Sequence, residues 1–349
     1  MKLKNIFIKN FRNYQNFSTE FSSKGAIFCG KNGAGKTSIL EAIFVFFSIF
    51  PFRSRYPEIF IKNDQNFTEI SAKTDSENFK FLWEIYPQKK STFFHLGVKK
   101  SIKEILQDKK FFAVLFTPED LQIPFLSPRD RRKKIDRIIF PLDPNIFQAS
   151  LKLKKILRQR NALLKIISQH LSKTEELDFF DQKLVEFSEI LSSKREEFCQ
   201  QISDDIRKNY FFISGKKEIL EIKFFRGWKG DLSKVLQENR KIEITKNRTE
   251  FGAHRDDFVF FLRGKNITEI GSRGEIRSAM LALKLAEKNF IENKVKISPI
   301  LLLDDVFSEL DADRRRKLNE FITNQQIFLT ATDIPSRAFL NIKLPIFQI

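Results

Sequence analysis

Cysteine is almost absent from this 349-residue chain, and no apolar run reaches membrane-spanning length. Cys29 and Cys199 are too few and too far apart for a disulfide framework of the kind found in small secreted proteins. The longest apolar run, Ala42–Phe52, is too short to span a bilayer, and no charged-then-apolar leader is visible at the N-terminus. We therefore expect a cytoplasmic protein with no membrane partner.

Negative charge is outnumbered, since 62 Lys and Arg against 44 Asp and Glu give a net charge of +18. Such an excess favours a polyanionic partner, with nucleic acid ahead of a membrane surface. The 40 phenylalanines and abundant lysine also fit drift toward an A/T-rich genome, which would spread lysine everywhere. Clusters therefore carry more weight than the total, and two occur, at Ser127–Arg137 and Lys152–Arg160.

Hydrophobic periodicity changes along the chain. Near the N-terminus, apolar residues alternate with polar ones, which predicts a half-buried hairpin. From about Pro144 the spacing becomes three and four residues, which predicts long helices at Phe147–Leu171 and Leu177–Tyr210. Sustained heptads are absent, which excludes a long coiled-coil rod. We expect an N-terminal lobe at 1–125, a helical insertion at 126–245 and a C-terminal lobe at 246–349.

A phosphate-binding loop is the strongest motif. "GKNGAGKT" matches G-x-x-x-x-G-K-[ST], with an apolar strand before it and a helix after it, a context that disfavours a chance glycine-rich turn. Backbone N–H groups and the helix N-terminus suit phosphate oxygens. Lys36 is expected to reach the β- and γ-phosphates of ATP, and Thr37 to bind Mg²⁺. The expected nucleotide-binding residues of the loop are Gly30, Lys31, Asn32, Gly33, Ala34, Gly35, Lys36 and Thr37.

Two adjacent carboxylates end the apolar run "PILLLDD". An apolar strand that ends in an acid is the Walker B arrangement of phosphate-loop enzymes, which assigns Asp304 to Mg²⁺, directly or through the metal's water. Asp305 follows at once, and we expect it to orient the water that attacks the γ-phosphate. A helix-capping or surface acid is the alternative for Asp305.

Two further motifs flank this strand. "SELD" at Ser308–Asp311 follows it, as the D-loop does in ABC-type ATPases. Upstream, Ser272 and Gly274 stand at the start of a helix expected at Gly274–Asn293, as in the ABC signature, although an ordinary N-cap at Ser272 is the alternative. This order of motifs predicts an α/β fold, an ABC-type ATPase head (a P-loop NTPase with a mixed sheet and helices) with an inserted helical lobe.

Over essentially its whole length, the chain resembles the RecF family of bacterial replication-gap and recombination-mediator ATPases. Three departures stand out: Ala253 replaces a usual Pro, Ser38 replaces a usual Asn, and Arg273 lies in a signature that reads SRGE instead of the commoner SQGQ. None removes a catalytic group. The resemblance is carried by "IKNFRNY", "GKNGAGKTSILEAI", "FTPEDL", "SPRDRRKKID", "LRQRNALLK", "TEFGAHRDD", "GSRGEIRSAMLALKLAE" and "PILLLDDVFSELDADRR".

The resemblance implies an ATP-dependent homodimer with nucleotide sandwiched between two subunits. Ser272 and Gly274 would act on the nucleotide bound by the other subunit, and Asp311 would face that subunit. It also implies binding of single- and double-stranded DNA and of gaps, with weak DNA-dependent hydrolysis as a switch. The partners implied are the RecO and RecR proteins, in support of RecA loading and SOS induction.

Smaller features leave alternatives open. For DNA phosphates we expect contacts from the first basic cluster, with a solvated helix end as the alternative. Arg12 contacts nucleotide or is a surface hairpin residue, and Thr330 is a candidate sensor of the γ-phosphate. His254 lacks metal-ligand neighbours, so a structural turn is favoured over a catalytic cluster. The competing functions are a transport-type ABC ATPase subunit and a chromosome-structure ATPase head. The expected DNA-binding residues are Arg129, Arg131, Arg132, Lys133 and Lys134.

Overall fold

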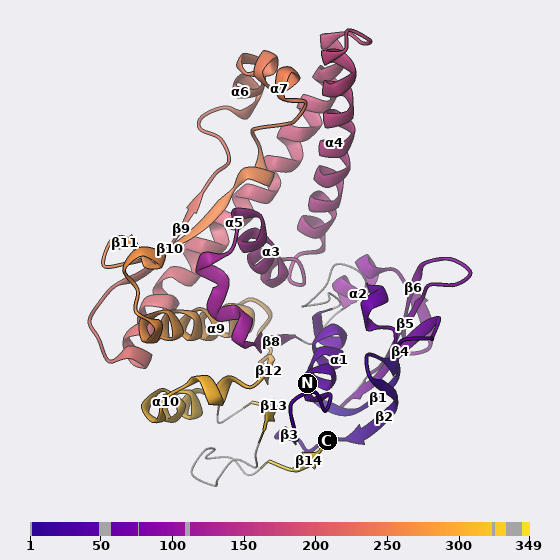
Figure 1. The fold of residues 1–349 in the computed structure, drawn as a ribbon, viewed down its shortest axis with the longest axis vertical. Helices are drawn as coiled ribbons and strands as arrows, with labels where there is room; N and C mark the ends of the chain where they lie inside the picture. Colours follow the sequence, from indigo (N-terminus) through magenta and orange to yellow (C-terminus); the bar gives the residue numbers. More distant parts are fainter. Residues whose placement is uncertain (1, 49–56, 76, 109–111, 323–324, 333–343) are drawn as a thin grey trace. The chain divides into compact units, whose positions relative to one another are not determined.

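The computed structural model describes residues 2–48, 57–75, 77–108, 112–322, 325–332 and 344–349 (Figure 1). The chain divides into two compact units, each built from segments that are distant in sequence. Unit 1 comprises Met1–Gln122, Asp205–Lys217 and Ser272–Ile349, and unit 2 comprises Ile123–Asp204 and Glu218–Gly271. Among the described residues, no helix combines the length and apolar character needed to cross a membrane.

A parallel sheet forms the centre of unit 1, with strand order β14–β3–β13–β12–β8. Every residue of β3 and β12 is buried, which explains why both appear in the sequence as continuous apolar runs. Their shared direction and register bring the ends of β3, β12 and β13 to one edge of the sheet. The strands are β3 (Gly25–Cys29), β8 (Ala113–Phe116), β12 (Ile300–Leu303), β13 (Ile327–Ala331) and β14 (Ile346–Gln348).

A second sheet of unit 1 is antiparallel, with strand order β2–β1–β4–β5–β6–β7. The predicted opening hairpin is confirmed by the antiparallel pairing of β1 with β2, and Leu3, Ile6 and Ile8 are fully buried on one face. The strands are β1 (Leu3–Phe11), β2 (Tyr14–Glu20), β4 (Phe67–Thr74), β5 (Asn78–Glu84), β6 (Lys90–His95) and β7 (Val98–Lys100).

Helices position the functional motifs of unit 1. α1 begins at Lys36, directly after the glycine-rich loop, and most of its residues are buried. The helix predicted at Gly274–Asn293 is confirmed as α9, which Ser272 caps at its N-terminus. The helices and 3₁₀ turns of this unit are α1 (Lys36–Ser48), η1 (Pro57–Phe60), α2 (Ile102–Asp108), η2 (Pro118–Phe125, which continues into unit 2), α9 (Arg273–Val295), η5 (Val306–Glu309) and α10 (Ala312–Ile322).

The two long predicted helices are confirmed in unit 2, with ends shifted by a few residues. α4 begins at Pro144 because the Asp143 carboxylate accepts hydrogen bonds from the first free N–H groups of the helix. Ser127 and Pro128 begin α3 in the same way. The helices are α3 (Pro128–Ile139), α4 (Pro144–Ser168), α5 (Leu177–Ser214, whose last turns belong to unit 1), α6 (Leu232–Glu238), α7 (Arg240–Lys246) and α8 (Ile267–Ile270).

The boundaries of the units differ from the predicted lobes in three segments, 123–125, 205–217 and 246–271. β10 (Asp257–Leu262) pairs with β9 (Leu220–Phe225) along its whole length and with the short β11 (Lys265–Asn266), so the segment after 245 remains in unit 2. Residues 205–217 instead join unit 1, where Asn209 donates a hydrogen bond to the carbonyl of Ala282 in α9. Strand pairing of this kind links distant segments and leaves no mark in local composition.

Candidate nucleotide site

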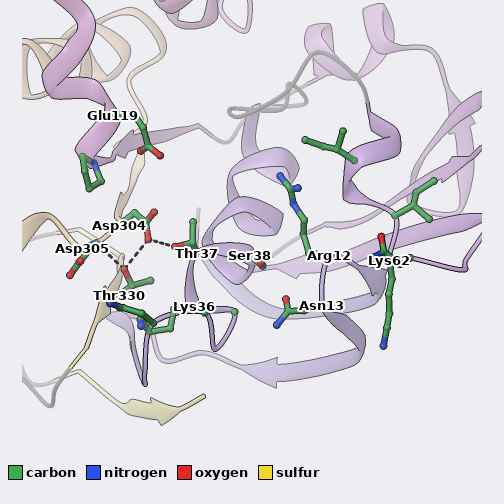
Figure 2. Close-up of a pocket in the computed structure, with 17 residues that line it drawn as sticks. Arg12, Asn13, Lys36, Thr37, Ser38, Lys62, Glu119, Asp304, Asp305 and Thr330 are labelled. Carbon is green, nitrogen blue, oxygen red and sulfur yellow. Dashed lines mark hydrogen bonds between the residues drawn. The ribbon is translucent and has the colours of Figure 1, made fainter.

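A cavity of about 890 Å³ opens at the edge of the parallel sheet in unit 1, where β3 and β12 end (Figure 2). Its size is that of a small-molecule pocket. Side chains from the glycine-rich loop, from the turn after β12 and from the β1–β2 hairpin line it together. Lining residues include Arg12, Asn13, Gly33, Lys36, Thr37, Lys62, Glu119, Asp304, Asp305 and Thr330.

The glycine-rich loop curls around its own lysine. The Lys36 ammonium donates hydrogen bonds to the carbonyl oxygens of Gly30 at 2.6 Å and Lys31 at 3.0 Å, and the side chain is buried. Gly33 has a φ of +82°, and a Cβ at this position would meet no atom within 4 Å. The loop therefore leaves open space over a backbone conformation that glycine adopts readily.

Gly35 is required for a different reason. Its φ is +108°, and a Cβ would lie 2.6 Å from the Tyr14 hydroxyl and 2.5 Å from the Asn13 amide nitrogen. The β1–β2 hairpin thus packs directly against the loop, and burial raises the pKa of Tyr14 to about 12. From the sequence alone no role is assigned to Tyr14, because its contact depends on how the hairpin folds back.

Asp304 is the centre of a hydrogen-bond network (Figure 2). Its Oδ1 accepts hydrogen bonds from the hydroxyl of Thr37 at 2.8 Å and from that of Thr330 at 2.9 Å. The Thr330 hydroxyl in turn accepts one from the Asp305 N–H at 2.8 Å. Thr330, which we expected to sense the γ-phosphate, therefore joins β13 to both acids in this structure.

The predicted Mg²⁺ ligands lie together. The Thr37 hydroxyl and the Asp304 carboxylate present hard oxygen atoms within 2.8 Å of each other on the cavity wall. Mg²⁺ binds oxygen donors of this kind and is usually held by one or two carboxylates, with water and substrate phosphates completing its coordination. The residues present therefore fit the metal. That Thr37 and Asp304 bind Mg²⁺ remains a prediction.

Asp304 and Asp305 differ in environment although they are adjacent. Asp304 is buried, with 3% of its surface exposed, whereas Asp305 is half-buried and lines the cavity. The backbone of Asp305 has a φ of +52°, in the left-handed region that Asp tolerates better than most residues. This turn separates the directions of the two carboxylates (Figure 2), as a division between metal binding and water orientation requires.

Arg12 stands in the cavity wall rather than on an unrelated surface. Its guanidinium donates to both carboxylate oxygens of Glu41, at 2.8 and 3.0 Å, and stacks over the Phe60 ring at 5.3 Å. Glu41 is buried, so this charge-assisted fork holds the guanidinium in one orientation. A cation fixed at the cavity wall is suited to an anionic ligand. Glu41 could not be found from sequence, since nothing local marks it as a partner of Arg12.

The signature and D-loop residues stand outside the cavity. Ser272, Gly274 and Asp311 are not among its described lining residues. Ser272 caps α9 in a capping box with Glu275, so the ordinary N-cap geometry is present. Asp311 pairs with Arg314 of α10. One chain therefore assembles the loop and the Walker B acids, and leaves its signature elsewhere.

The basic residues expected to contact DNA lie on α3 in unit 2. Arg131 donates to both carboxylate oxygens of Asp257, at 2.9 and 2.6 Å, and Arg132 donates to the Asp256 carbonyl. Burial, with the neighbouring charge of Arg195, lowers the pKa of Arg132 to about 10. Two of the five predicted cations are thus engaged within the unit, and a DNA-contacting role for the set remains a prediction.

Lys133 is also engaged, in an ion pair with Asp130, while Arg129 is exposed. The "HRDD" segment supplies the acids for this region, which explains its unusual composition. Asp256 accepts from Arg195 at 2.8 Å, and the His254 Nε2–H donates to the carbonyl of Thr249 at 3.0 Å. These contacts correspond to the structural turn that the sequence favoured over a catalytic cluster.

Comparison with known proteins agrees with this geometry. The family profile described as the RecF/RecN/SMC N terminal domain matches residues 2–334. The DNA replication and repair protein RecF of Acetivibrio thermocellus is 34% identical, covering 95% of this chain and 94% of its own length. That of Streptococcus gordonii is 35% identical, covering 100% and 98%.

Solved structures give the same result. The recombination mediator protein RecF with ATP, of the RecFOR pathway, is 31% identical with a TM-score of 0.88, covering 96% of this chain and 93% of its own. An SMC head bound to the C-winged helix domain of ScpA is 16% identical with a TM-score of 0.50, which shows a shared fold alone. The chain therefore belongs to the RecF family and has the fold of an ABC-type ATPase head of the RecF and SMC kind.

Proposed function

We propose that this chain is an ATP-dependent DNA-binding protein of DNA replication and recombinational gap repair. ATP binding drives two copies together on single- or double-stranded DNA, and weak, DNA-dependent hydrolysis separates them. One observation carries the proposal: a phosphate loop and two Walker B acids share a cavity, while the signature and D-loop of the same chain lie outside it. Such a half-site is completed by a second copy.

Within one chain, the loop and the acids bind and orient the nucleotide. Lys36 exchanges the neutral carbonyls of Gly30 and Lys31 for charged phosphate oxygens, which form stronger hydrogen bonds. Thr37 and Asp304 hold Mg²⁺, which when bound neutralises charge on the β- and γ-phosphates. Asp305 accepts a hydrogen bond from the attacking water and so fixes its position.

The second copy supplies Ser272, Gly274 and Asp311. The N-terminus of α9 carries free N–H groups and a partial positive charge, both of which favour a γ-phosphate. When hydrolysis removes that phosphate, the two basic subunits lose the anion that joined them. A ligand shifts an association equilibrium only if it binds the dimer more tightly than the monomer, and the γ-phosphate makes that difference here. Hydrolysis thus acts as a switch rather than as a source of product.

Partners follow from the relatives. Two solved RecF structures are of proteins of the RecFOR pathway. On that basis we propose RecO and RecR as partners, with support of RecA loading and SOS induction as the outcome. The cytoplasm is the proposed location, because ATP and chromosomal DNA are both there. The family match over residues 2–334 disfavours a transport-type ABC ATPase subunit.

The test measures association state and DNA binding with ATP, ADP and no nucleotide, over a salt series. We expect dimers only with ATP, and DNA affinity that falls steeply with salt. Asp305→Asn should slow hydrolysis by roughly 10²–10⁴-fold and preserve ATP-driven dimers, because it removes the water-orienting base alone.

Lys36→Ala is the matched control, and it should lose ATP binding and dimers together. DNA binding that ignores both nucleotide and salt would refute the proposed function. Normal hydrolysis by Asp305→Asn would refute the role given to that residue.

A further inference from the structure

One face of α4 in unit 2 carries positive charge alone. The helix has 25 residues and no Asp or Glu, in a chain with 44 acids among 349 residues. Uniform drift toward lysine would not remove the acids from one helix. Its cations are Lys152, Lys154, Lys155, Arg158, Arg160 and Lys165.

Helical geometry gathers four of these cations opposite the core. At about 100° per residue, Lys154, Arg158 and Lys165 lie within roughly 40° of one another, and Lys155 lies about 60° further round. The buried side of the helix, which includes Arg160, faces the other way. All four outward cations are exposed. We call Lys154, Lys155, Arg158 and Lys165 the α4 stripe.

The α4 stripe differs from the other two cations of α4, Lys152 and Arg160, in having no internal partner. Within the described part of the chain, no hydrogen bond or ion pair engages any of its four charged groups. By contrast, Arg160 on the inner side is fully buried among acids, and Lys152 stacks over the Phe187 ring at 5.5 Å. Uncompensated like charges repel one another, and a polyanion relieves that repulsion.

We propose that the α4 stripe is a contact surface for DNA phosphates. The inference rests on the proposed DNA-binding function, and it places the contact on α4 instead of on the α3 cluster. The stripe extends over about 16 Å of helix axis at 1.5 Å per residue. One DNA strand carries a phosphate every 3.4 Å or so along its axis, so the stripe spans roughly five phosphates.

The test replaces all four stripe cations with glutamine: Lys154→Gln, Lys155→Gln, Arg158→Gln and Lys165→Gln. Glutamine is a good helix former, so the fold is retained. The matched control removes four exposed lysines of unit 1 and the same net charge: Lys24→Gln, Lys73→Gln, Lys99→Gln and Lys103→Gln. With ATP present, DNA affinity is measured across a salt series for both variants and the unaltered chain.

We expect the stripe variant to lose affinity by on the order of 10²-fold or more, and its log–log salt slope to fall by about 3–4. The control should keep the slope of the unaltered chain. Equal slopes in the two variants would overturn the stripe while leaving the proposed function intact. The stripe would also be overturned if the stripe variant lost binding to anionic lipid vesicles and kept the DNA affinity of the unaltered chain. No DNA binding by the unaltered chain would remove the proposed function itself.

A second inference rests on Arg314 in α10, independently of the stripe. Its Nε donates to the Ser278 hydroxyl at 2.8 Å, its Nη2 donates to the Gly274 carbonyl at 3.1 Å, and its Nη1 pairs with the Asp311 carboxylate. The guanidinium lies so close that a Cβ on Gly274 would come within 3.2 Å of Nη2. One side chain thus joins the D-loop to the first turns of α9.

The geometry points to Arg314 as a positioning residue for the two segments that the proposed function offers to a second copy. A planar fork of fixed donors can hold Gly274 and Asp311 in one arrangement, which a lysine ammonium cannot do. The inference rests on the proposed ATP sandwich. The new element is that Arg314 holds the signature and the D-loop in one fixed arrangement, so both contact the nucleotide of the second copy together.

Dimers of two different variants distinguish a positioning role of Arg314 from a merely structural one. Lys36→Ala chains bind no ATP but keep an intact signature, so each mixed dimer has one complete site. In a mixture with Arg314→Ala, that site uses the loop of the Arg314→Ala chain and the signature of the other. With a different label on each chain so that only mixed dimers are followed, we expect this pair to associate with ATP as strongly as the unaltered chain does with Lys36→Ala.

Arg314→Ala alone should dimerise more weakly, by roughly 10-fold or more, because each of its sites lacks a positioned signature. Arg314→Lys should restore little of this loss. If Arg314→Ala dimerises like the unaltered chain, or if its mixed dimer with Lys36→Ala is weaker than the mixed dimer of the unaltered chain with Lys36→Ala, the inference is wrong. Absence of ATP-driven dimers in the unaltered chain would instead refute the proposed function.

Discussion

α3 and α4 each carry a dense positive cluster, and the fold uses the two clusters in opposite ways. In α3, Arg131 and Arg132 turn inward to the Asp257 carboxylate and the Asp256 carbonyl. In α4, the stripe cations face solvent without partners among the described residues. The residues that Arg131 and Arg132 contact lie more than a hundred positions later in the sequence. A basic cluster therefore indicates a binding surface only after its internal partners have been identified.

α4 itself has both kinds of cation, one that points inward and others that face solvent. Replacing the inward one has the largest expected effect on stability. Arg160 is fully buried and donates to Asp181 at 2.7 Å and to Glu243 at 2.7 Å. Arg160→Ala leaves the buried Glu243 without its cation and leaves Asp181 with Arg240 alone, and we expect it to destabilise unit 2 by about 3–5 kcal/mol. Arg158→Ala, two residues away and exposed, should change stability by less than about 0.5 kcal/mol. Urea unfolding of the full chain measures both, and similar midpoints would contradict the prediction.

The inward-facing charges of α3 and α4 act on His254, so its protonation makes the stability of the fold depend on pH. Burial lowers its pKa to about 4, and the charges of Arg255, Arg132 and Arg160 contribute in the same direction, against the hydrogen bond to the Thr249 carbonyl. Between about pH 4 and the ordinary value of about 6.5, the unfolded chain binds a proton that the folded chain refuses. Stability from this residue is therefore complete above about pH 6.5 and lost as pH falls toward 4, by about 3 kcal/mol in total.

The measurement compares unfolding midpoints at several pH values in that window for the unaltered chain and for His254→Gln. Glutamine does not titrate, so the variant should show a shallower fall in stability toward acid. If the two chains lose stability in parallel, His254 is protonated in the fold, and the inward charges of α3 and α4 do not act on it as described.

Local motifs predicted which residues meet at the cavity of unit 1, because its main parts are contiguous in sequence. The glycine and lysine spacing predicts the loop before α1, and the apolar run that ends in two acids predicts the Walker B residues after β12. The parallel sheet brings Thr37 to Asp304 across 267 residues. The ABC-type fold followed from the order of the motifs. The parts that sequence missed are contacts between segments, such as Tyr14 against Gly35 and Glu41 under Arg12. Pairing of β9 with β10 moved the boundary of the insertion for the same reason.

The smallest effects test whether α3 contributes to DNA binding at all. Arg131→Gln removes a fork to Asp257 that is mostly buried, and we expect a loss of about 1–3 kcal/mol in stability with little change in DNA affinity. Arg129→Gln should leave stability within about 0.5 kcal/mol, because the side chain is exposed. If α3 also contacts phosphate, Arg129→Gln lowers the salt slope by about 1. An unchanged slope assigns the contact to α4 alone, whereas a larger change than in the stripe variant would reverse the contrast between the two helices.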